Sequence, residues 1–349
     1  MEDLSMIVIP ADDLRATATA IFRAAGSGPE PTAILVDHLI DANLAGHDSH
    51  GIQHIPGYVQ AVERGAVKPN ARPVVKRETP VSALVDGGWT FGQVSMRFAI
   101  DLAIAKAKAS GVAVVGVVGC THIGRLGTYS TIAAREGVFA MITTGNLDDA
   151  TAPFGGRKGV CGTIPFSFGF PAGERPDLMI DFATSAIAGG KVAVAKAKHE
   201  QVPPGCLVDK DGNPTTDPDA LFNGGMLLPF GGHKGSALAT LSTLLSLVLV
   251  PGSEYQDGFP LPGSFILAID SNLFRDRTTV ESETDGIIDR IKKVPPAAGF
   301  TEVQVPGEPE VRSAERRGRE GIPVPDDTWT EILSTAARLG VEVKVPAIR

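Results

Sequence analysis

The centre of the chain alternates between helical and strand-like patterns, and this limits the fold more than any other feature. Residues 97–111 and 126–137 repeat apolar positions with helical spacing, whereas 112–118 and 138–145 are short apolar runs typical of strands. Such alternation predicts an α/β protein, and a parallel doubly wound sheet is the default arrangement. A dinucleotide-binding sheet of that kind should carry GxGxxG between a strand and a helix. The nearest spacing, GVVGCTHIG at 116–124, does not match it.

Elements outside the centre follow from apolar spacing and from helix caps. A strand at 177–183 should run into a helix at 184–200, with Thr184 or Ser185 as its cap. The other expected elements are helices ending at Gly26 and Gly46, a short helix at 56–67, a turn-rich loop at 209–219, a buried helix at 236–250, a strand at 264–270, and helices at 308–320 and 326–339.

Charge and cysteine content restrict the partners and the compartment. The formal net charge is −8, and nucleic acid or an anionic membrane surface would need a basic face, so neither is an expected partner. Cys120, Cys161 and Cys206 form no CxxC pair, which is typical of buried thiols in a reducing cytoplasm. The most apolar helix, 236–250, is shorter than the roughly 20 residues that span a bilayer, and the N-terminus lacks the pattern of a signal peptide. We therefore expect a cytoplasmic protein.

Three histidines, His47, His50 and His54, fall close together in the stretch GHDSHGIQHIPGY at 46–58. On one continuous helix they could bind zinc together with Asp48, but the glycines and the proline of this stretch disfavour such a helix. Two other interpretations stay open. The histidines either support a turn by bonding to the backbone, or an imidazole donates to an anionic oxygen of a substrate.

Two further stretches carry residue types suited to chemistry. His122 lies just past the strand at 112–118, where an imidazole can act as a general acid or base or simply bond within a turn. Arg125 could pair with a substrate anion or with a structural carboxylate. Asp181 lies near the end of the strand at 177–183, before an expected helix N-terminus, which suits a bound anion and a ribose hydroxyl, or plain capping.

A glycine-rich stretch, PFGGHKGSAL at 229–238, places Lys234 at the start of the expected buried helix. It is not a P-loop, because GxxxxGK[ST] is absent. Glycines beside a lysine and a helix N-terminus still suit a phosphate or a nicotinamide ribose. A shorter copy, FGGRKG at 154–159, carries Lys158.

Taken in order, these and other pieces of the sequence resemble the malate/L-lactate dehydrogenase family, whose members are NAD(P)-dependent 2-hydroxyacid oxidoreductases unrelated to the Rossmann-type enzymes. The family also includes ureidoglycolate, sulfolactate and 2,3-diketogulonate dehydrogenases, and reductases of the cyclic imines piperideine- and pyrroline-2-carboxylate. The matching pieces span about residues 10–345 and are GHDSHG, HIGRLGTY, PFGG, GTIPFSF, MIDFATS with GGK, DKDGNPTTDP, PFGGHKG and PAAGFTEVQVPGEPE.

The resemblance implies a fold different from the parallel default. The family has a non-Rossmann α/β fold with a large, mostly antiparallel sheet flanked by helices, in two domains, and forms homodimers. Residues 1–75 and 295–349 are then expected to form a helical domain for dimerisation and substrate binding. Residues 76–294 would form the NAD(P)-binding domain. This fold also explains why GxGxxG is missing.

The resemblance also implies roles for particular residues. His122 is the expected proton donor and acceptor at the substrate, and His50 is an expected substrate-binding residue. Substrate contacts are also expected at His54 and Arg125. The expected cofactor contacts are Leu147, Asp181, Phe182, Ala183 and Lys234.

Two positions depart from the family pattern. His54 stands where many members carry an arginine that clamps the substrate carboxylate with a two-pronged bond, which histidine cannot form. Arg125 or Arg157 is a candidate for supplying the missing charge. Ile164, in GTIP, replaces the asparagine of a GTNP motif.

The sequence thus predicts an NAD- or NADP-dependent oxidoreductase that interconverts a small 2-oxoacid and its 2-hydroxyacid. One alternative on the same fold is a cyclic-imine reductase, and another is a protein that binds the cofactor without turnover. An alternative of a different class is a metal-binding protein or hydrolase built on His47, His50 and His54.

Overall fold

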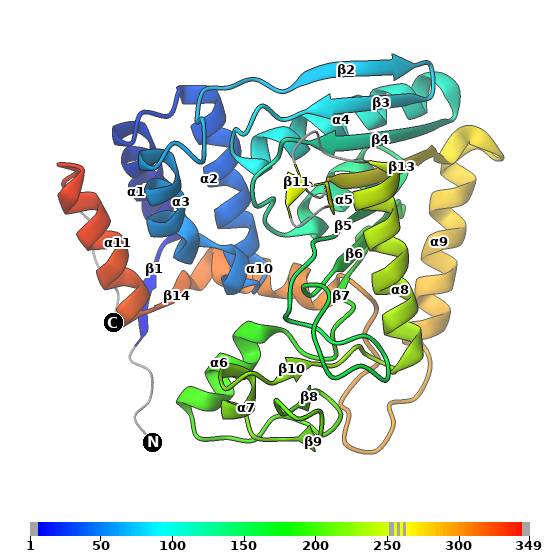
Figure 1. Cartoon of the computed structure of the whole chain (residues 1–349). Coiled ribbons are helices and arrows are strands. Elements are labelled where there is room, and N and C mark those ends of the chain that lie inside the picture. The colour runs from blue at the N-terminus through cyan, green and yellow to red at the C-terminus, as the bar shows by residue number, and fades with distance from the viewer. Residues whose placement is uncertain (1–5, 251–254, 257–258, 261–262, 344–349) are drawn as a thin grey trace.

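The computed structural model describes residues 6–250, 255–256, 259–260 and 263–343, and its centre is a sheet of seven strands. The strands lie in the order β2-β3-β4-β13-β5-β6-β7 (Figure 1), and β3 with β4 is the one parallel pair among these seven. The strands are β2 (Val74–Thr79), β3 (Ser82–Asp86), β4 (Val112–Val118), β13 (Ser264–Asp270), β5 (Val138–Thr144), β6 (Pro165–Phe170) and β7 (Leu178–Ala183). The expectation of a mostly antiparallel sheet in an α/β fold is confirmed, and the parallel doubly wound default is wrong.

One face of the sheet is covered by α4 (Gly92–Ser110) and α5 (Leu126–Arg135). Because side chains alternate along a strand, every second residue of β4 and β5 points into this core, and Val115 and Ile142 are fully buried there. Each such side chain stabilises the fold by roughly 1.5–3 kcal/mol relative to leaving it in water. The loop from β4 to α5 carries His122, so this core also holds the base of that loop.

A second core joins the two ends of the chain. Near the N-terminus, β1 (Met6–Ile9) pairs antiparallel with β14 (Ile322–Pro325). The helices of this part are α1 (Ala11–Ala24), α2 (Pro29–Leu44), α3 (Ile55–Glu63), α10 (Glu308–Glu320) and α11 (Asp326–Arg338). Phe22, Leu39 and Ile332 are buried together in this core. The outermost parts of the expected helical domain, 1–5 and 344–349, lie outside the described residues.

A small lobe lies below the sheet (Figure 1). It contains α6 (Gly189–Ala197), β8 (Leu207–Val208), β9 (Pro214–Thr215), α7 (Asp219–Phe222) and β10 (Met226–Leu227). Its apolar centre includes Val192 and Leu207. The predicted turn is present, because the Asp209 carboxylate accepts from the backbone amides of Asp211 and Asn213 at 2.9 Å each.

The helix expected at 184–200 differs from the structure. It begins at Gly189 and ends at Ala197, and neither Thr184 nor Ser185 caps it. Thr184 lies in a bend just past the end of β7, and the helix starts only four residues after Ser185. The Thr184 amide bonds to the carbonyls of Thr163 and Ile164, and Ser185 forms a bridge with Pro229.

The helix expected at 236–250 is present but is not a buried core helix. It consists of α8 (His233–Thr243) and a π-helical segment, Leu244–Leu249, and it crosses the second face of the sheet. Its outer side is apolar and open, because Leu241, Leu244, Val248 and Leu249 have 46, 51, 64 and 63% of their surfaces exposed. Within the described ranges, no helix has the length and apolar character needed to cross a membrane.

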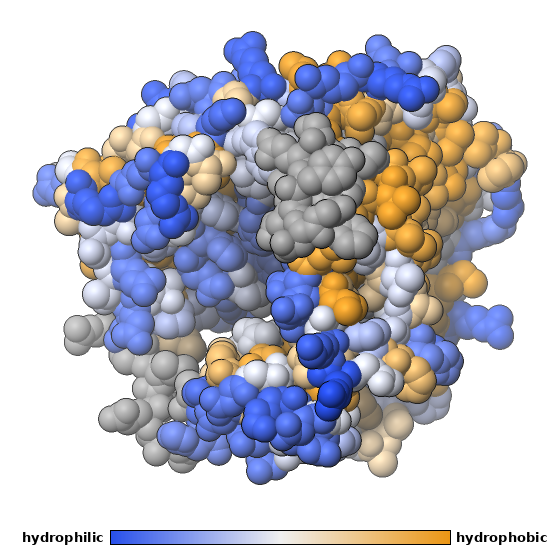
Figure 2. Space-filling model, in the orientation of Figure 1, coloured by the Kyte–Doolittle hydropathy of each residue, from blue (hydrophilic) through white to orange (hydrophobic). Residues whose placement is uncertain are grey.

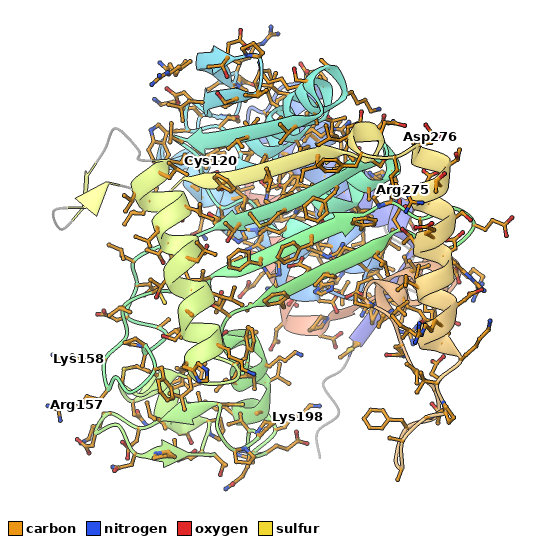
Figure 3. The ribbon with its side chains drawn as sticks, turned by 90° about the vertical axis from the view of Figure 1, so that its right-hand side faces the viewer. Cys120, Arg157, Lys158, Lys198, Arg275 and Asp276 are labelled. Atoms are coloured by element: carbon orange, nitrogen blue, oxygen red, sulfur yellow. The ribbon has the colours of Figure 1, made fainter. Side chains whose placement is uncertain are left out.

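The second face of the sheet is only partly covered. Figure 3 shows α8 along one side of this face and α9 (Arg277–Lys292) along the other, with strands visible between them. Phe170 of β6 and Ile180 of β7 each keep 37% of their surface exposed there. Apolar surface gathers on the side of the molecule where α8 lies (Figure 2).

Candidate active site

The histidine-rich stretch begins where α2 ends and forms two short 3-10 turns, Asp48–His50 and Ile52–His54. Buried Asn43 joins the two turns, because its side chain donates to Asp48 at 2.6 Å and accepts from the amide of Ile52 at 2.8 Å. The expected break in the helix is therefore confirmed.

Two more residues fix the shape of this stretch. Arg317 of α10 donates to both carboxylate oxygens of Asp48. Gly51 passes so close to Asn43 that a Cβ there would lie 2.1 Å from the side-chain oxygen, so no other residue fits without a rearrangement. These contacts hold the neighbouring His50 and His54 in place.

The imidazoles of His50, His54 and His122 converge. The ring centroid of His122 lies 4.9 Å from that of His54 and 5.9 Å from that of His50, and the latter two are 6.4 Å apart. His122 comes from the loop between β4 and α5, whereas the other two come from the 3-10 turns. The structure thus brings together three of the residues that the sequence singled out, at the junction of the helical core and the sheet.

Several ring nitrogens already have partners. His54 donates from Nε2 to the carbonyl oxygen of Ser49 at 2.8 Å, and Nδ1 of His50 bonds to the Ser49 hydroxyl at 3.0 Å. His47 is directed away from the cluster and bonds through Nε2 to Glu310 of α10 at 3.1 Å. His47 therefore supports the turn.

The arrangement gives the metal interpretation no support. Among the described residues, no group of three or more His, Cys, Asp or Glu side chains could hold a metal ion. His47 and His54 each commit one nitrogen to a protein acceptor.

The surroundings favour the neutral form of these imidazoles. Burial, together with the neighbouring His54 and His50, lowers the pKa of His122 to about 4. Burial, followed by His54 and other nearby cationic groups, lowers the pKa of His50 to about 4. Burial also lowers the pKa of His54. Part of the His122 side chain nonetheless remains accessible to solvent. An anion that binds there would favour the charged form of each ring.

Tyr58 and Gln93 complete the cluster, and the sequence analysis missed both. The Tyr58 hydroxyl lies 2.6 Å from Nδ1 of His122, and Gln93 donates from Nε2 to that hydroxyl at 2.9 Å. Tyr58 follows His54 by four residues, and the two rings stack at 5.3 Å. That helical spacing was a usable signal for Tyr58. Gln93 belongs to no motif, and only the fold places it here.

Arg125 is buried, with 6% of its side chain exposed. Its guanidinium lies 3.4 Å from Asp41 and 3.7 Å from the sulfur of Met179, and its backbone amide donates to His38 at 3.0 Å. It borders a pocket of about 460 Å³ that the three converging imidazoles do not line. The ion pair with a structural carboxylate is thus present, and a substrate role for Arg125 stays a prediction.

Asp181 connects β7 to the start of α5, the helix that follows the loop with His122. Its carboxylate accepts from the amide of Gly127 at 2.7 Å and so caps the first turn of α5, not the N-terminus of α6. Burial raises the pKa of Asp181, and the nearby Arg125 opposes this. The next residue, Phe182, packs edge to face on Phe230 with ring centroids 5.6 Å apart.

Lys234 lies exposed in the first turn of α8, close to the end of β7. The amide of Phe230 bonds to the carbonyl of Thr184 at 2.9 Å. A Cβ at Gly235 would lie 2.4 Å from the carbonyl oxygen of Phe230, so this glycine lets the helix start pack tightly. The fold therefore brings Lys234 next to the segment that follows Ala183.

Two other residues from the sequence analysis lie elsewhere. Leu147 is 43% exposed in the loop after β5. Arg157 packs against the turn at Gly212, and Figure 3 shows Arg157 and Lys158 far from Cys120, which precedes His122 by two residues. Within one chain, Arg157 therefore does not bring its charge to the imidazole cluster.

Comparisons with known proteins agree with this architecture. Residues 9–333 match the model of the family described as malate/L-lactate dehydrogenase. Hydroxycarboxylate dehydrogenase B of Escherichia coli K12 is 36% identical over 341 residues, which cover 95% of this chain and 94% of that protein. L-sulfolactate dehydrogenase of Methanocaldococcus jannaschii is 34% identical, over 93% of this chain and 95% of that protein.

A solved structure shares the fold. The structure of a putative malate/lactate dehydrogenase from E. coli superposes with a TM-score of 0.89 at 34% identity and covers 96% of each chain. Sequence, sheet topology and this superposition extend over nearly the whole chain. The protein belongs to the malate/L-lactate dehydrogenase family.

Proposed function

We propose that this protein is a nicotinamide-dependent oxidoreductase that interconverts a 2-oxoacid and its 2-hydroxyacid. The observation that carries this proposal is the convergence of His50, His54 and His122 in a chain of this dehydrogenase family. A reduced nicotinamide, when bound, supplies a hydride to the carbonyl carbon. The residues of the chain must then hold the substrate and supply a proton to its carbonyl oxygen.

His122 is the proposed proton donor and acceptor. Its Nδ1 bonds to Tyr58, so Nε2, on the other side of the ring, is left for the substrate oxygen. In the reduction an imidazolium stabilises the negative charge that develops on this oxygen and gives it the proton from Nε2. In the oxidation neutral His122 takes the hydroxyl proton back.

His50 and His54 are the proposed partners of the substrate carboxylate. Nε2 of His54 is bonded to the Ser49 carbonyl and must carry a proton, so the neutral ring offers only an acceptor at Nδ1. Such a ring attracts a carboxylate only after it takes up a second proton. Buried Arg125 lies near enough to His50 to affect its charge, and it would add positive potential behind the site.

The cofactor is NAD or NADP. It would lie along the end of β7 and the start of α8. Lys234 is exposed at a helix N-terminus that follows two glycines with positive φ, which suits a phosphate or ribose. Phe182 and Ala183 would contact it from β7, and Leu147 from the loop after β5. Asp181 would act mainly by positioning this strand end, because its carboxylate is already bonded to α5.

The test is a substrate panel assayed with NADH and with NADPH, containing malate-, lactate- and sulfolactate-type 2-oxoacids and piperideine-2-carboxylate. We expect turnover of at least one 2-oxoacid and a loss of roughly a hundredfold or more in His122→Asn. Turnover of the cyclic imine alone would replace the proposal with the imine reductase. Cofactor binding without turnover of any panel member would favour a binding protein.

We also propose that each chain has the two expected domains, 1–75 plus 295–349 and 76–294. We further propose a homodimer that buries the open apolar face around α8. The exposed Leu244, Val248 and Leu249 form an apolar surface that a second copy would cover. Sedimentation of the wild type should give twice the mass of one chain, and Val248→Glu should shift it toward the monomer. Monomeric wild type would contradict this.

The three free cysteines suit the proposed cytoplasmic location.

A further inference from the structure

Tyr58 and Gln93 extend the hydrogen bonding of His122 into the protein. The Tyr58 hydroxyl lies 2.6 Å from Nδ1 of His122, and Gln93, which is 1% exposed, donates to that hydroxyl at 2.9 Å. The side-chain oxygen of Gln93 is buried and has no hydrogen-bond partner. A buried amide oxygen without a partner is costly, by about 1–3 kcal/mol, and calls for an explanation.

The unpartnered oxygen is explained if the hydroxyl of Tyr58 changes direction. When Gln93 donates to Tyr58, the hydroxyl proton is free to point at Nδ1, which suits a neutral His122 with its proton on Nε2. When both nitrogens of His122 carry protons, Nδ1–H must donate to Tyr58 instead. The tyrosine proton then needs another acceptor. A half-turn of the Gln93 amide presents its oxygen at the position of the nitrogen and supplies that acceptor.

We propose that Tyr58 and Gln93 form a two-state relay that positions His122 and serves both of its protonation states. This inference rests on the proposed role of His122 as the proton donor. In the reduction, Nε2 gives its proton to the substrate oxygen as the carbon gains the hydride. The ring is then neutral with its proton on Nδ1, still donated to Tyr58, and this is the form that takes the hydroxyl proton at Nε2 in the oxidation. Tyr58 itself keeps its proton throughout, because burial raises its pKa above the usual range. Tyr58 is thus a positioning residue, not a proton donor.

Other groups around His122 cannot replace this relay. The titratable side chains that face it are Tyr58 of α3, His50 and His54 of the 3-10 turns, and His38 of α2. His54 commits Nε2 to Ser49, and His38 accepts from the amide of Arg125. Of these side chains, Tyr58 is the one whose hydrogen bond to Nδ1 is observed.

The first test is Tyr58→Phe, which removes only the hydroxyl. We expect kcat to fall at least about tenfold, while KM for the 2-oxoacid changes by less than about twofold, because Tyr58 acts through His122. Tyr129→Phe is the matched control, since it removes a buried hydroxyl that bonds to the carbonyl of Ile123 at 2.5 Å. The melting temperatures of the two variants should fall below that of the wild type by similar amounts. Unchanged kcat in Tyr58→Phe would overturn the relay.

The second test does not depend on turnover. Nitrogen-15 NMR of labelled protein reports which ring nitrogen of His122 carries a proton, with His122→Asn identifying the signal. The wild type should show one defined tautomer, and Tyr58→Phe a mixture. Gln93→Glu offers only an acceptor to Tyr58, so it should raise the pKa of His122 by about one unit or more.

The two kinds of failure can be told apart. A wild type that shows the defined tautomer but reduces no panel substrate would contradict the proposed function and leave the hydrogen-bond relay intact. The relay is wrong if Gln93→Glu leaves the titration of His122 unchanged, or if Tyr58→Phe keeps a single tautomer. If Tyr58→Phe does not fold, the titrations of the wild type and of Gln93→Glu decide the matter.

Discussion

Nε2 of His54 donates to the carbonyl oxygen of Ser49 at 2.8 Å, so the residue that stands in place of the family's arginine has one nitrogen left for a ligand. An arginine at position 54 would present a two-pronged donor that is charged at every working pH. We expect His54→Arg to raise kcat/KM for 2-oxoacids at pH 7.5 about tenfold or more, which is about 1.4 kcal/mol, mainly through a lower KM.

The control for this change is His54→Gln, which restores no charge and should not lower KM. Steady-state kinetics on the responsive 2-oxoacid measure both variants. If arginine and glutamine behave alike, position 54 does not contact the substrate carboxylate.

The low pKa of His122 predicts opposite pH dependences for the two directions of the reaction. Reduction needs the imidazolium, and with a pKa near 4 the protonated fraction falls about tenfold for each pH unit above it. Log kcat/KM for the 2-oxoacid should therefore decline with a slope near −1 from pH 6 to pH 8. Oxidation needs the neutral ring, so its profile should be flat over this range. A flat profile for the reduction would argue against His122 as the donor.

His38 should make the stability of the protein depend on pH. It is 4% exposed and accepts from the amide of Arg125, and burial, followed by Arg125, lowers its pKa from 6.5 to about 3. The unfolded chain therefore binds this proton more readily. Above pH 6.5 His38 is neutral in both the folded and the unfolded chain, so it does not lower the free energy of unfolding. As the pH falls from 6.5 toward 3, the free energy of unfolding should decline by up to about 1.4 kcal/mol per pH unit.

The measurement is urea unfolding between pH 7 and pH 4. His38→Gln keeps an acceptor for the Arg125 amide but does not titrate, so its stability should decline less steeply than that of the wild type. His199→Gln, at an exposed position, should follow the wild type. Equal slopes for all three proteins would show that His38 is not the group responsible.

Much of the architecture could be predicted where local pattern and tertiary environment agree. The strands at 112–118 and 264–270 match the structure at both ends, and so does the helix at 308–320. The strand at β6 was missed, although Phe166, Phe168 and Phe170 alternate with Ser167 and Gly169 in the period of two that is typical of a strand. The edge hairpin of β2 and β3 was missed too, since its first strand is exposed throughout and carries no apolar alternation.

The site was only partly predictable, for a related reason. A motif can point to His50 and His122, but their approach depends on how α2, α3 and the β4–α5 loop pack. Asp181 illustrates the limit. The sequence places it before a helix N-terminus, whereas in the fold it caps a different helix, α5, that precedes it by about fifty residues. Such a partner can be found only once the strands are paired.

Ile164 combines a sequence anomaly with a strained backbone, and this makes it a sharp test of the structure. Its φ is +43°, in the left-handed region that asparagine adopts more easily than a β-branched residue. It is also 1% exposed, in an apolar cluster with Cys161 and Ala239.

In Ile164→Asn, relief of backbone strain should offset part of the penalty for burying an amide. Ile142→Asn, at a fully buried position of β5, has no such offset. Chemical denaturation should therefore show that Ile164→Asn loses less free energy of unfolding than Ile142→Asn, by at least about 1 kcal/mol. Equal losses would mean that the backbone at position 164 stores no strain.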